Sequence, residues 1–513
     1  MTENPATKKA IQPPEKHAIS PTIKQQLAYA VPSIGVIFLM GPINIIQGIY
    51  AKYFGLSLAV IATVVLTVRL FDVVTDPIIG YFSDKYTMRT GSRKPFIVGG
   101  GILLFISSYF LFVPVNPVLV DANTQVSGLY FLLCFLAFYL GFTLYEIPHQ
   151  SWGATLSSTS EGRNTVFTLR AAAVSVGLLL FYAVPLLPLF ESRSFTPETT
   201  QWSVLFAGML LLPALFVCVK STPNGYAIQT TATRKEVSDG VGANQPDKEP
   251  STAKEQQWRL LMSALFGNKS LVLFYGASAC YGVSVGAFYG LEFIFIDTYL
   301  GMGEDYALIN ICGMFSALIS LIVWRKVICI LGKKVTWVVS KVLIILSCLM
   351  LASLTPGETS FWDLLLPQTL FLVGAICEGL AGYSLLADLI DYSTWKYRRE
   401  QTATFFSLNT TIFKCFPPIS AALGMIVVGW YGFDPAAPAY SADIAFGMRL
   451  VIGWVPSVFL FLGIVFVLLI PLNSGHSEII RQRLMIRAAR ANRAQQKNSH
   501  TGFNVGKEIE LNV

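Results

Sequence analysis

The chain has 513 residues, of which 53% are hydrophobic and 13% charged, and its net charge is +7. Soluble domains carry about 25% charged residues, so this composition, with a mean hydropathy of +0.57, excludes an ordinary soluble protein. The net charge does not indicate nucleic-acid binding, because the basic residues fall in short turns between apolar runs. The cysteines lie inside those runs without a CxxC pair, a pattern of small core residues that supports neither a disulfide framework nor a zinc site.

About twelve runs of roughly 18 or more mostly apolar residues follow one another along the chain, each long enough to cross about 30 Å of hydrocarbon. We therefore predict an all-α integral membrane protein with twelve transmembrane helices in two six-helix halves. The predicted spans are 28–50, 58–82, 96–115, 128–153, 165–190, 202–219, 271–297, 306–329, 335–354, 362–389, 403–430 and 446–472.

A polar segment divides these spans six and six. Residues 221–257 are rich in Thr, Ser, Gly, Lys and Glu and poor in aromatic residues, a composition that cannot bury a core and is typical of a flexible linker. The predicted parts are a tail (1–27), a first bundle (28–219), this linker (220–270), a second bundle (271–472) and a basic tail (473–513). In that last tail, 479–493 is either an amphipathic surface helix or a solvated one.

Lysine and arginine mark one side of the predicted membrane protein. They gather in both tails, in the linker and in alternate turns, whereas the opposite turns are sparse and mostly acidic. Because cytoplasmic loops carry the excess of Lys and Arg, both termini are predicted to be cytoplasmic, which requires an even number of spans.

The second span carries charges that lipid would not tolerate. Arg69, Asp72 and Asp76 are spaced i, i+3 and i+7 and so project from one helix face, with Thr75 beside them. A charge at the centre of a spanning helix costs about 2.5–3.5 kcal/mol, so these side chains must face a cavity or each other. One Arg against two Asp leaves a carboxylate over, for which a cation or proton is the natural partner. A static Arg–carboxylate lock between helices is the alternative.

These residues belong to a longer pattern. Asp72-x-x-Thr-Asp-Pro-x-x-Gly-x-x-x-Asp84-Lys85, followed by Gly91-Ser-Arg93-Lys94-Pro95, resembles the major facilitator superfamily. More narrowly, the chain resembles the glycoside–pentoside–hexuronide:cation symporters, the melibiose permease-like family. The likeness continues through Thr143-Leu-Tyr-Glu-Ile-Pro148, Arg170, Ala387-Asp-Leu-Ile-Asp-Tyr392, Trp395-Lys396 and Lys414.

The resemblance implies a function. It implies a secondary active transporter that couples Na⁺ or H⁺ to the symport of a sugar or glycoside-type solute by alternating access between two halves. It implies a multi-pass protein of the bacterial inner membrane, a monomer and not an enzyme. Its only ion is the co-transported Na⁺ or H⁺, and it needs no cofactor, no other metal and no nucleic acid.

The resemblance also implies site residues. The cation-binding residues would be Asp72, Thr75, Asp76 and Thr143, with Arg69, Thr410 and Lys414 as charge partners. Glu146 and Arg170 would hold the solute, and Gln150 stands where the family has an aromatic residue. Thr143 and Glu146 are spaced i and i+3, so the cation and solute groups would share one helix face.

Other polar residues do not decide which class of solute is carried. Residues 25–51 contain no charged residue, whereas the family has an acid there, so a lipid-like or acidic solute is the alternative to a sugar. Asn44 and Gln47 are candidates to hydrogen-bond a polyol or to join helices. Glu292 and Glu378, each among apolar neighbours, line the solute pathway or are structural carboxyl groups.

Overall fold

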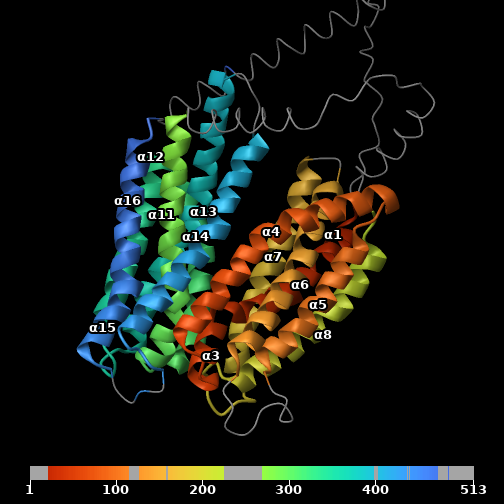
Figure 1. Cartoon of the computed structure of the whole chain (residues 1–513). Coiled ribbons are helices and arrows are strands. Elements are labelled where there is room, and N and C mark those ends of the chain that lie inside the picture. Colours follow the sequence, from red (N-terminus) through yellow and green to blue (C-terminus); the bar gives the residue numbers. More distant parts are fainter. Residues whose placement is uncertain are drawn as a thin grey trace, which may run out of the picture. The chain divides into compact units, whose positions relative to one another are not determined.

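The computed structural model describes residues 21–114, 126–157, 160–224, 268–397, 402–435, 437, 440–471 and 483. These residues form helices and short connections, without a strand among them. Figure 1 shows the helices; their bounds are α1 (Ile23–Ala30), α2 (Pro32–Met40), η1 (Gly41–Asn44), α3 (Ile46–Phe54), α4 (Leu58–Thr90), α5 (Lys94–Phe112), α6 (Gly128–Thr155), α7 (Ser160–Ala183), η2 (Val184–Leu186), α8 (Pro197–Ser221), α11 (Lys269–Phe293), η3 (Ile294–Tyr299), α12 (Gly303–Ser353), α13 (Phe361–Tyr397), α14 (Thr402–Trp430), α15 (Ala442–Arg449), η4 (Leu450–Trp454) and α16 (Val455–Leu469).

The helices are those of a multi-pass membrane protein. Within the described residues, 11 helical stretches are long and apolar enough to cross a bilayer. Large apolar side chains are also exposed along them, such as Met209 (68%) and Phe216 (67%) on α8. In water such surfaces would be costly, but lipid tails are as apolar as the side chains themselves. The predicted all-α integral membrane protein is confirmed.

One helical run accounts for the difference between twelve predicted spans and eleven observed stretches. The spans 306–329 and 335–354 both fall within α12, which has 51 residues and at 1.5 Å per residue would be about 77 Å long. Gly332 interrupts it with φ 79° and ψ 162°, which is outside the helical region. The chain therefore changes direction within α12 at a single glycine rather than in a loop.

The first predicted span, 28–50, is built from several short pieces instead of one continuous helix. It comprises the last three residues of α1, then α2, the 3₁₀ turn η1 and part of α3. Pro32 stands in the first turn of α2, and Pro42 stands in the first turn of η1. Proline has no N–H to donate and its ring clashes with the preceding turn, so each begins a new helical segment.

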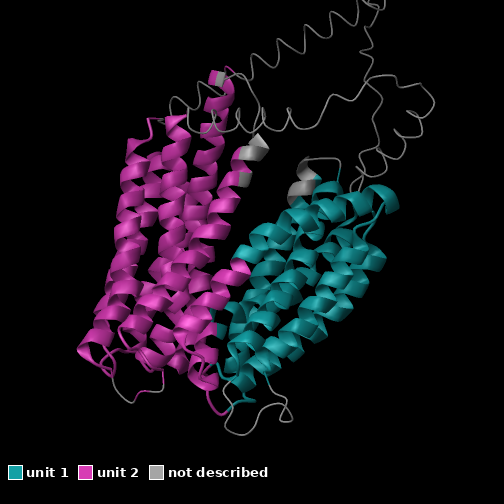
Figure 2. Ribbon diagram, viewed as in Figure 1, with its two compact units in different colours: residues 1–46, 70–190, 195–245 teal, residues 47–69, 191–194, 246–513 magenta. Residues whose placement is uncertain are grey.

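Two compact units make up the structure (Figure 2). Unit 1 comprises 1–46, 70–190 and 195–245. Its helices α5 and α6 meet through glycines: a Cβ added at Gly100 would lie 2.4 Å from the backbone nitrogen of Tyr145, and one at Gly141 would lie 2.5 Å from that of Leu104. Small residues let membrane helices approach closely, and this contact fixes the part of α6 that carries Glu146.

Unit 2 comprises 47–69, 191–194 and 246–513. Its core joins α11, α12, α13 and α16 through buried apolar side chains, among them Phe274, Trp337, Leu386 and Val467. The rings of Phe274 and Trp337 stack with their centroids 5.0 Å apart. Most of the predicted linker and, apart from Arg483, the predicted helix 479–493 lie outside the described residues.

Candidate functional site

The charged face predicted on the second span lies on α4. Arg69, Asp72, Thr75 and Asp76 are all partly buried there. The Thr75 hydroxyl donates to the Phe71 carbonyl oxygen at 3.1 Å. Pro77 follows Asp76 inside the helix, and since proline has no N–H, the carbonyl four residues earlier loses its intrahelical hydrogen bond. Oxygen atoms of side chains and backbone are thus concentrated on one stretch of α4, as a site for a hard cation requires.

Helix α6 lies near this stretch within unit 1. A Cβ added at Gly80 of α4 would lie 3.9 Å from the Ile147 Cγ2 atom of α6. Thr143 on α6 is buried, with 4% of its surface exposed. The roles predicted for Thr143 and for the α4 residues remain predictions.

The structure brings together Glu146, Gln150 and Arg170, three residues predicted to bind the solute. The Arg170 guanidinium forms an ion pair with the Glu146 carboxylate, joining α7 to α6. The Gln150 Nε2 atom donates to the same carboxylate at 2.5 Å. The side chains of the pair are 14% and 17% exposed, so they are neither sealed in the core nor fully solvated. The cluster therefore presents hydrogen-bond donors and acceptors side by side at the surface of unit 1.

A residue that the sequence analysis missed, Tyr29, holds the next turn of α6. Its ring stacks on the fully buried His149 ring at 4.1 Å, and its hydroxyl donates to the His149 carbonyl at 2.9 Å. The His149 Nε2 atom lies 3.0 Å from the Tyr29 carbonyl oxygen. The Tyr145 ring also stacks on the His149 ring, with the ring centroids 4.8 Å apart. These contacts bind α6 to α1 beside Glu146. No sequence signal sets Tyr29 apart from other tyrosines in apolar helices.

Four further predicted residues lie elsewhere. Thr410 and Lys414 are exposed on α14 of unit 2, and the Thr410 hydroxyl donates to the Phe406 carbonyl at 3.1 Å. Asn44 is exposed at the end of η1, whereas Gln47 is buried on α3. Their predicted roles as charge partners or solute ligands stay predictions.

Glu292 and Glu378 are both buried in unit 2, but in different surroundings. The Glu292 carboxylate accepts a hydrogen bond from the Gln368 side chain, which also donates to Asn310 at 3.2 Å. The groups around Glu292 in this network are therefore neutral amides. Glu378 instead pairs with Lys341 at 2.7 Å.

Lys341 was not singled out by the sequence analysis. Its side chain is 0% exposed and is buried in the ion pair with Glu378. It is the only charged residue in the run 335–354. A lone charge inside a predicted span was the signal that would have found it.

Comparisons with known proteins place the chain in a family. The family model described as "MFS/sugar transport protein" matches residues 28–474. The chain is 23% identical over 447 residues to an uncharacterized symporter, YjmB, of Bacillus subtilis (strain 168), covering 85% of this chain and 89% of that one. It is 23% identical over 443 residues to the glucuronide carrier protein homolog of Escherichia coli (strain K12), with the same shares covered.

A solved structure supports the fold. The crystal structure of a D-xylose-proton symporter superposes with a TM-score of 0.56 at 13% identity, covering 86% of this chain and 95% of that chain. At this identity the likeness concerns the fold alone. The members of the matched family are membrane transporters rather than enzymes, and the match covers most of the chain. The chain therefore belongs to the MFS/sugar transport protein family.

Proposed function

We propose that this protein is a secondary active transporter that carries a sugar or glycoside together with a cation, Na⁺ or H⁺, by alternating access. The observation that carries the proposal is the Glu146–Arg170 ion pair with Gln150 beside it, partly exposed on unit 1. Carboxylates and guanidinium groups are the side chains that bind several hydroxyl groups at once. The sugar transport family to which the chain belongs supports the same solute class.

The proposed topology follows from the length of α12. A helical run of 51 residues exceeds what one crossing of about 30 Å needs, and Gly332 divides it. Counted as two crossings, α12 raises the total to twelve, an even number that puts both termini on one side of the membrane. The excess of Lys and Arg in the tails and in the linker 220–270 favours the cytoplasm as that side. The two bundles, 28–219 and 271–472, would then be the halves that alternate.

Coupling is proposed to act through α4. Asp72 and Asp76 on one helix face repel each other when both are ionised, and a bound cation relieves that repulsion. If the loaded state binds solute more tightly, solute must raise cation affinity by the same factor. Thr75 and Thr143 are proposed to complete the cation site.

The test is solute uptake into proteoliposomes that contain the purified full-length protein. Accumulation of D-xylose, lactose, raffinose and methyl β-D-glucuronide is measured with an imposed Na⁺ gradient, an imposed H⁺ gradient and neither. We expect at least one of these solutes to accumulate only when a gradient is present. Equal uptake in all three conditions would overturn cation coupling, and no uptake of any of the four would overturn the proposed solute class.

The same assay tests the solute site. Glu146→Gln and Arg170→Gln each remove one charge of the pair, and each should lower solute affinity at least tenfold. The matched control is Glu198→Gln, which neutralises an exposed glutamate in the first turn of α8, a helix that carries neither member of the pair. Native affinity in both site variants would show that the cluster does not hold the solute.

A further inference from the structure

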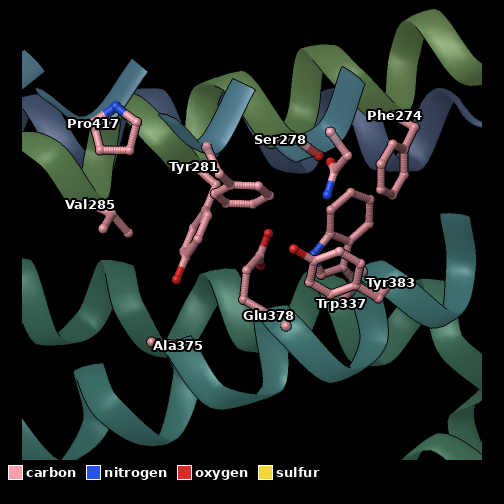
Figure 3. A pocket seen from close by; sticks show the side chains of 13 residues that line it. Phe274, Ser278, Tyr281, Val285, Trp337, Ala375, Glu378, Tyr383 and Pro417 are labelled. Atoms are coloured by element: carbon pink, nitrogen blue, oxygen red, sulfur yellow. The ribbon is translucent and has the colours of Figure 1, made fainter. Parts of the chain in front are cut away.

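A cavity in unit 2 has the composition of a small-molecule site. Its volume is about 330 Å³, within the range of roughly 300–1,000 Å³ for small-molecule pockets. Residues of α11, α12, α13 and α14 line it. Figure 3 shows Glu378 pointing into the space between Tyr281 on one side and Trp337 with Tyr383 on the other.

The charged groups at this cavity balance each other. Glu378 accepts from the Lys341 ammonium at 2.7 Å and from the Ser340 hydroxyl at 3.3 Å. The ammonium also lies 4.5 Å from the centre of the Trp337 ring and 5.2 Å from that of Tyr281. The site therefore has no net charge to offer an ionic solute, while a carboxylate still has lone pairs for hydroxyl donors.

Two polar groups in the cavity wall lack hydrogen bonds. Within the part of the chain that the structure describes, neither the Trp337 Nε1 donor nor the Asn409 Oδ1 acceptor has a partner. Trp337 is 1% exposed and Asn409 is 2% exposed, so water does not freely reach them. Buried polar groups are normally paired, and an unpaired donor and acceptor in one wall are matched by a ligand that carries hydroxyl groups.

Apolar rings supply the rest of the wall. Phe274, Tyr281, Tyr383 and Phe413 line the cavity together with Trp337. Tyr383 is 46% exposed, so the cavity runs from an open edge to the buried Trp337. Aromatic faces with a few convergent polar groups suit a pyranose ring, which has apolar C–H faces and hydroxyl groups around its rim.

A glycine keeps the cavity open. Gly379 lies in the wall one residue after Glu378, and a Cβ added there would have nothing within 4 Å. Gly382, one turn later, adjoins the unpaired indole, since its added Cβ would lie 3.3 Å from Trp337 Nε1. A Cβ at 379 would therefore enter the space without meeting a protein atom.

We propose that this cavity binds the ring of an uncharged, hydroxylated solute, a neutral pyranose sugar, and that it selects neutral sugars over acidic ones. The Glu378 carboxylate would accept from sugar hydroxyls, and the Trp337 N–H would donate to one. The inference rests on the proposed function for the solute class, and it assigns a subsite that the Glu146–Arg170 pair does not provide. A carboxylated sugar would bring an unbalanced charge into a site whose own charges are already paired.

The experiment fills the cavity without breaking the ion pair. Gly379→Val places a side chain in the open space, and Gly99→Val is the matched control, because Gly99 also lies in a helix interior with nothing within 4 Å of an added Cβ. Purified full-length proteins are titrated with D-xylose, lactose, raffinose and methyl β-D-glucuronide while tryptophan fluorescence is recorded. Thermal unfolding of each variant is measured alongside.

We expect wild-type protein and Gly99→Val to bind at least one neutral sugar more tightly than the glucuronide, and Gly379→Val to bind it at least tenfold more weakly with an unchanged melting temperature. Equal binding by Gly379→Val, tighter binding of the glucuronide, or no binding of any neutral sugar by the wild-type protein would overturn the inference.

Two further readouts keep the outcomes separate. Trp337→Phe retains an aromatic ring but removes the N–H, so it should weaken sugar binding several-fold. If Gly379→Val does not fold, Trp337→Phe tests the proposed subsite in its place. Native sugar affinity in Trp337→Phe would then overturn the subsite. Gradient-independent uptake in proteoliposomes together with cavity-dependent sugar binding would overturn the proposed coupling while leaving this inference in place.

Discussion

Lys341 and Glu378 are buried charges whose energies depend on each other. Their side chains are 0% and 3% exposed, and they are joined at 2.7 Å. Removing one member of such a pair costs about 3–5 kcal/mol, because the other charge is left buried without compensation, whereas replacing both can be nearly neutral. We therefore predict that Lys341→Met destabilises the protein by about 3–5 kcal/mol and that adding Glu378→Leu recovers most of the loss, as measured by thermal unfolding in detergent.

A second ion pair of unit 2 serves as the control. Lys333 pairs with Asp388 at the same distance of 2.7 Å, but these side chains are 31% and 18% exposed. Partly exposed pairs contribute about 0–1 kcal/mol, so Lys333→Met should have a small effect. Equal melting temperatures for Lys341→Met and wild-type protein would contradict the argument from burial.

The Glu292 carboxylate is hydrogen-bonded to a neutral amide, whereas Glu378 is paired with a charge, so substitutions of Glu292 are expected to affect stability differently from those of Glu378. Gln368 is 0% exposed and donates to the Glu292 carboxylate. Glu292→Gln retains an acceptor for that amide and should fold with little loss. Glu292→Leu leaves Gln368 only its hydrogen bond to Asn310, so one buried N–H loses its acceptor, which should cost about 1–3 kcal/mol. Thermal unfolding of the two variants distinguishes them; if the Leu variant were the more stable one, the hydrogen bond would not be stabilising.

The sequence predicts site residues most directly where the surrounding residues form a recognisable motif. Glu146 and Arg170 match a known motif, and the structure joins them in an ion pair. Lys341 matches no such motif and was read as part of an apolar run. Its partner on α13 is 37 residues away in the chain, so only the packing of the two helices reveals the pair.

Among the helices, α12 depends on a single residue at its bend. Gly332 has φ 79° and ψ 162°, a conformation that is essentially restricted to glycine. Strain of this kind costs about 1–3 kcal/mol in other residues, so Gly332→Ala should destabilise the protein by that amount. Gly99→Ala, in a helical and open position, should instead be neutral or slightly stabilising. Similar melting temperatures for the two variants would contradict the strain at the bend.

The π-helical turn η3 is tied to α3 by an unequal ion pair. Lys52 meets Asp297 at 2.7 Å, and their side chains are 30% and 1% exposed. Lys52→Ala leaves a buried carboxylate, whereas Asp297→Asn leaves an ammonium that can turn toward water. We predict that the first change costs more, about 1–3 kcal/mol, than the second. Thermal unfolding of both variants checks the order, and the reverse order would contradict it.

The pH dependence of this contact follows from the pKa of Lys52. Burial by itself lowers that pKa, but the hydrogen bond and the charge of Asp297 outweigh it, and the pKa is raised above its ordinary value. The stability due to the ammonium is therefore fully present below the unfolded pKa of about 10.4, and it is lost only as the pH rises through the folded pKa. Between about pH 6 and 9, the difference in stability between wild-type protein and Lys52→Ala should stay constant. A marked fall in that difference within this range would contradict the raised pKa.

For the molecule as a whole, the sequence predicted what depends on hydropathy and local pattern. Apolar runs predicted an all-α multi-pass membrane protein, because only closed hydrogen-bonded structures such as helices cross lipid. Pattern also located α4 and its charged face. It did not predict that the spans 306–329 and 335–354 share one bent helical run, since a bend at Gly332 depends on backbone angles that hydropathy does not report. The cavity beside Glu378 was equally out of reach, because its wall combines side chains of four helices.

The proposal that solute transport is coupled to a cation through α4 is tested most directly by one variant, Asp76→Asn. The asparagine keeps the size of the side chain but removes the charge that would hold the cation. Uptake of the transported sugar is measured in proteoliposomes with an imposed Na⁺ or H⁺ gradient, for wild-type and variant proteins reconstituted in equal amounts. We predict that wild-type protein accumulates the sugar above its external concentration and that Asp76→Asn only equilibrates it. Accumulation by Asp76→Asn to the wild-type level, driven by the same gradient, would contradict the proposed coupling.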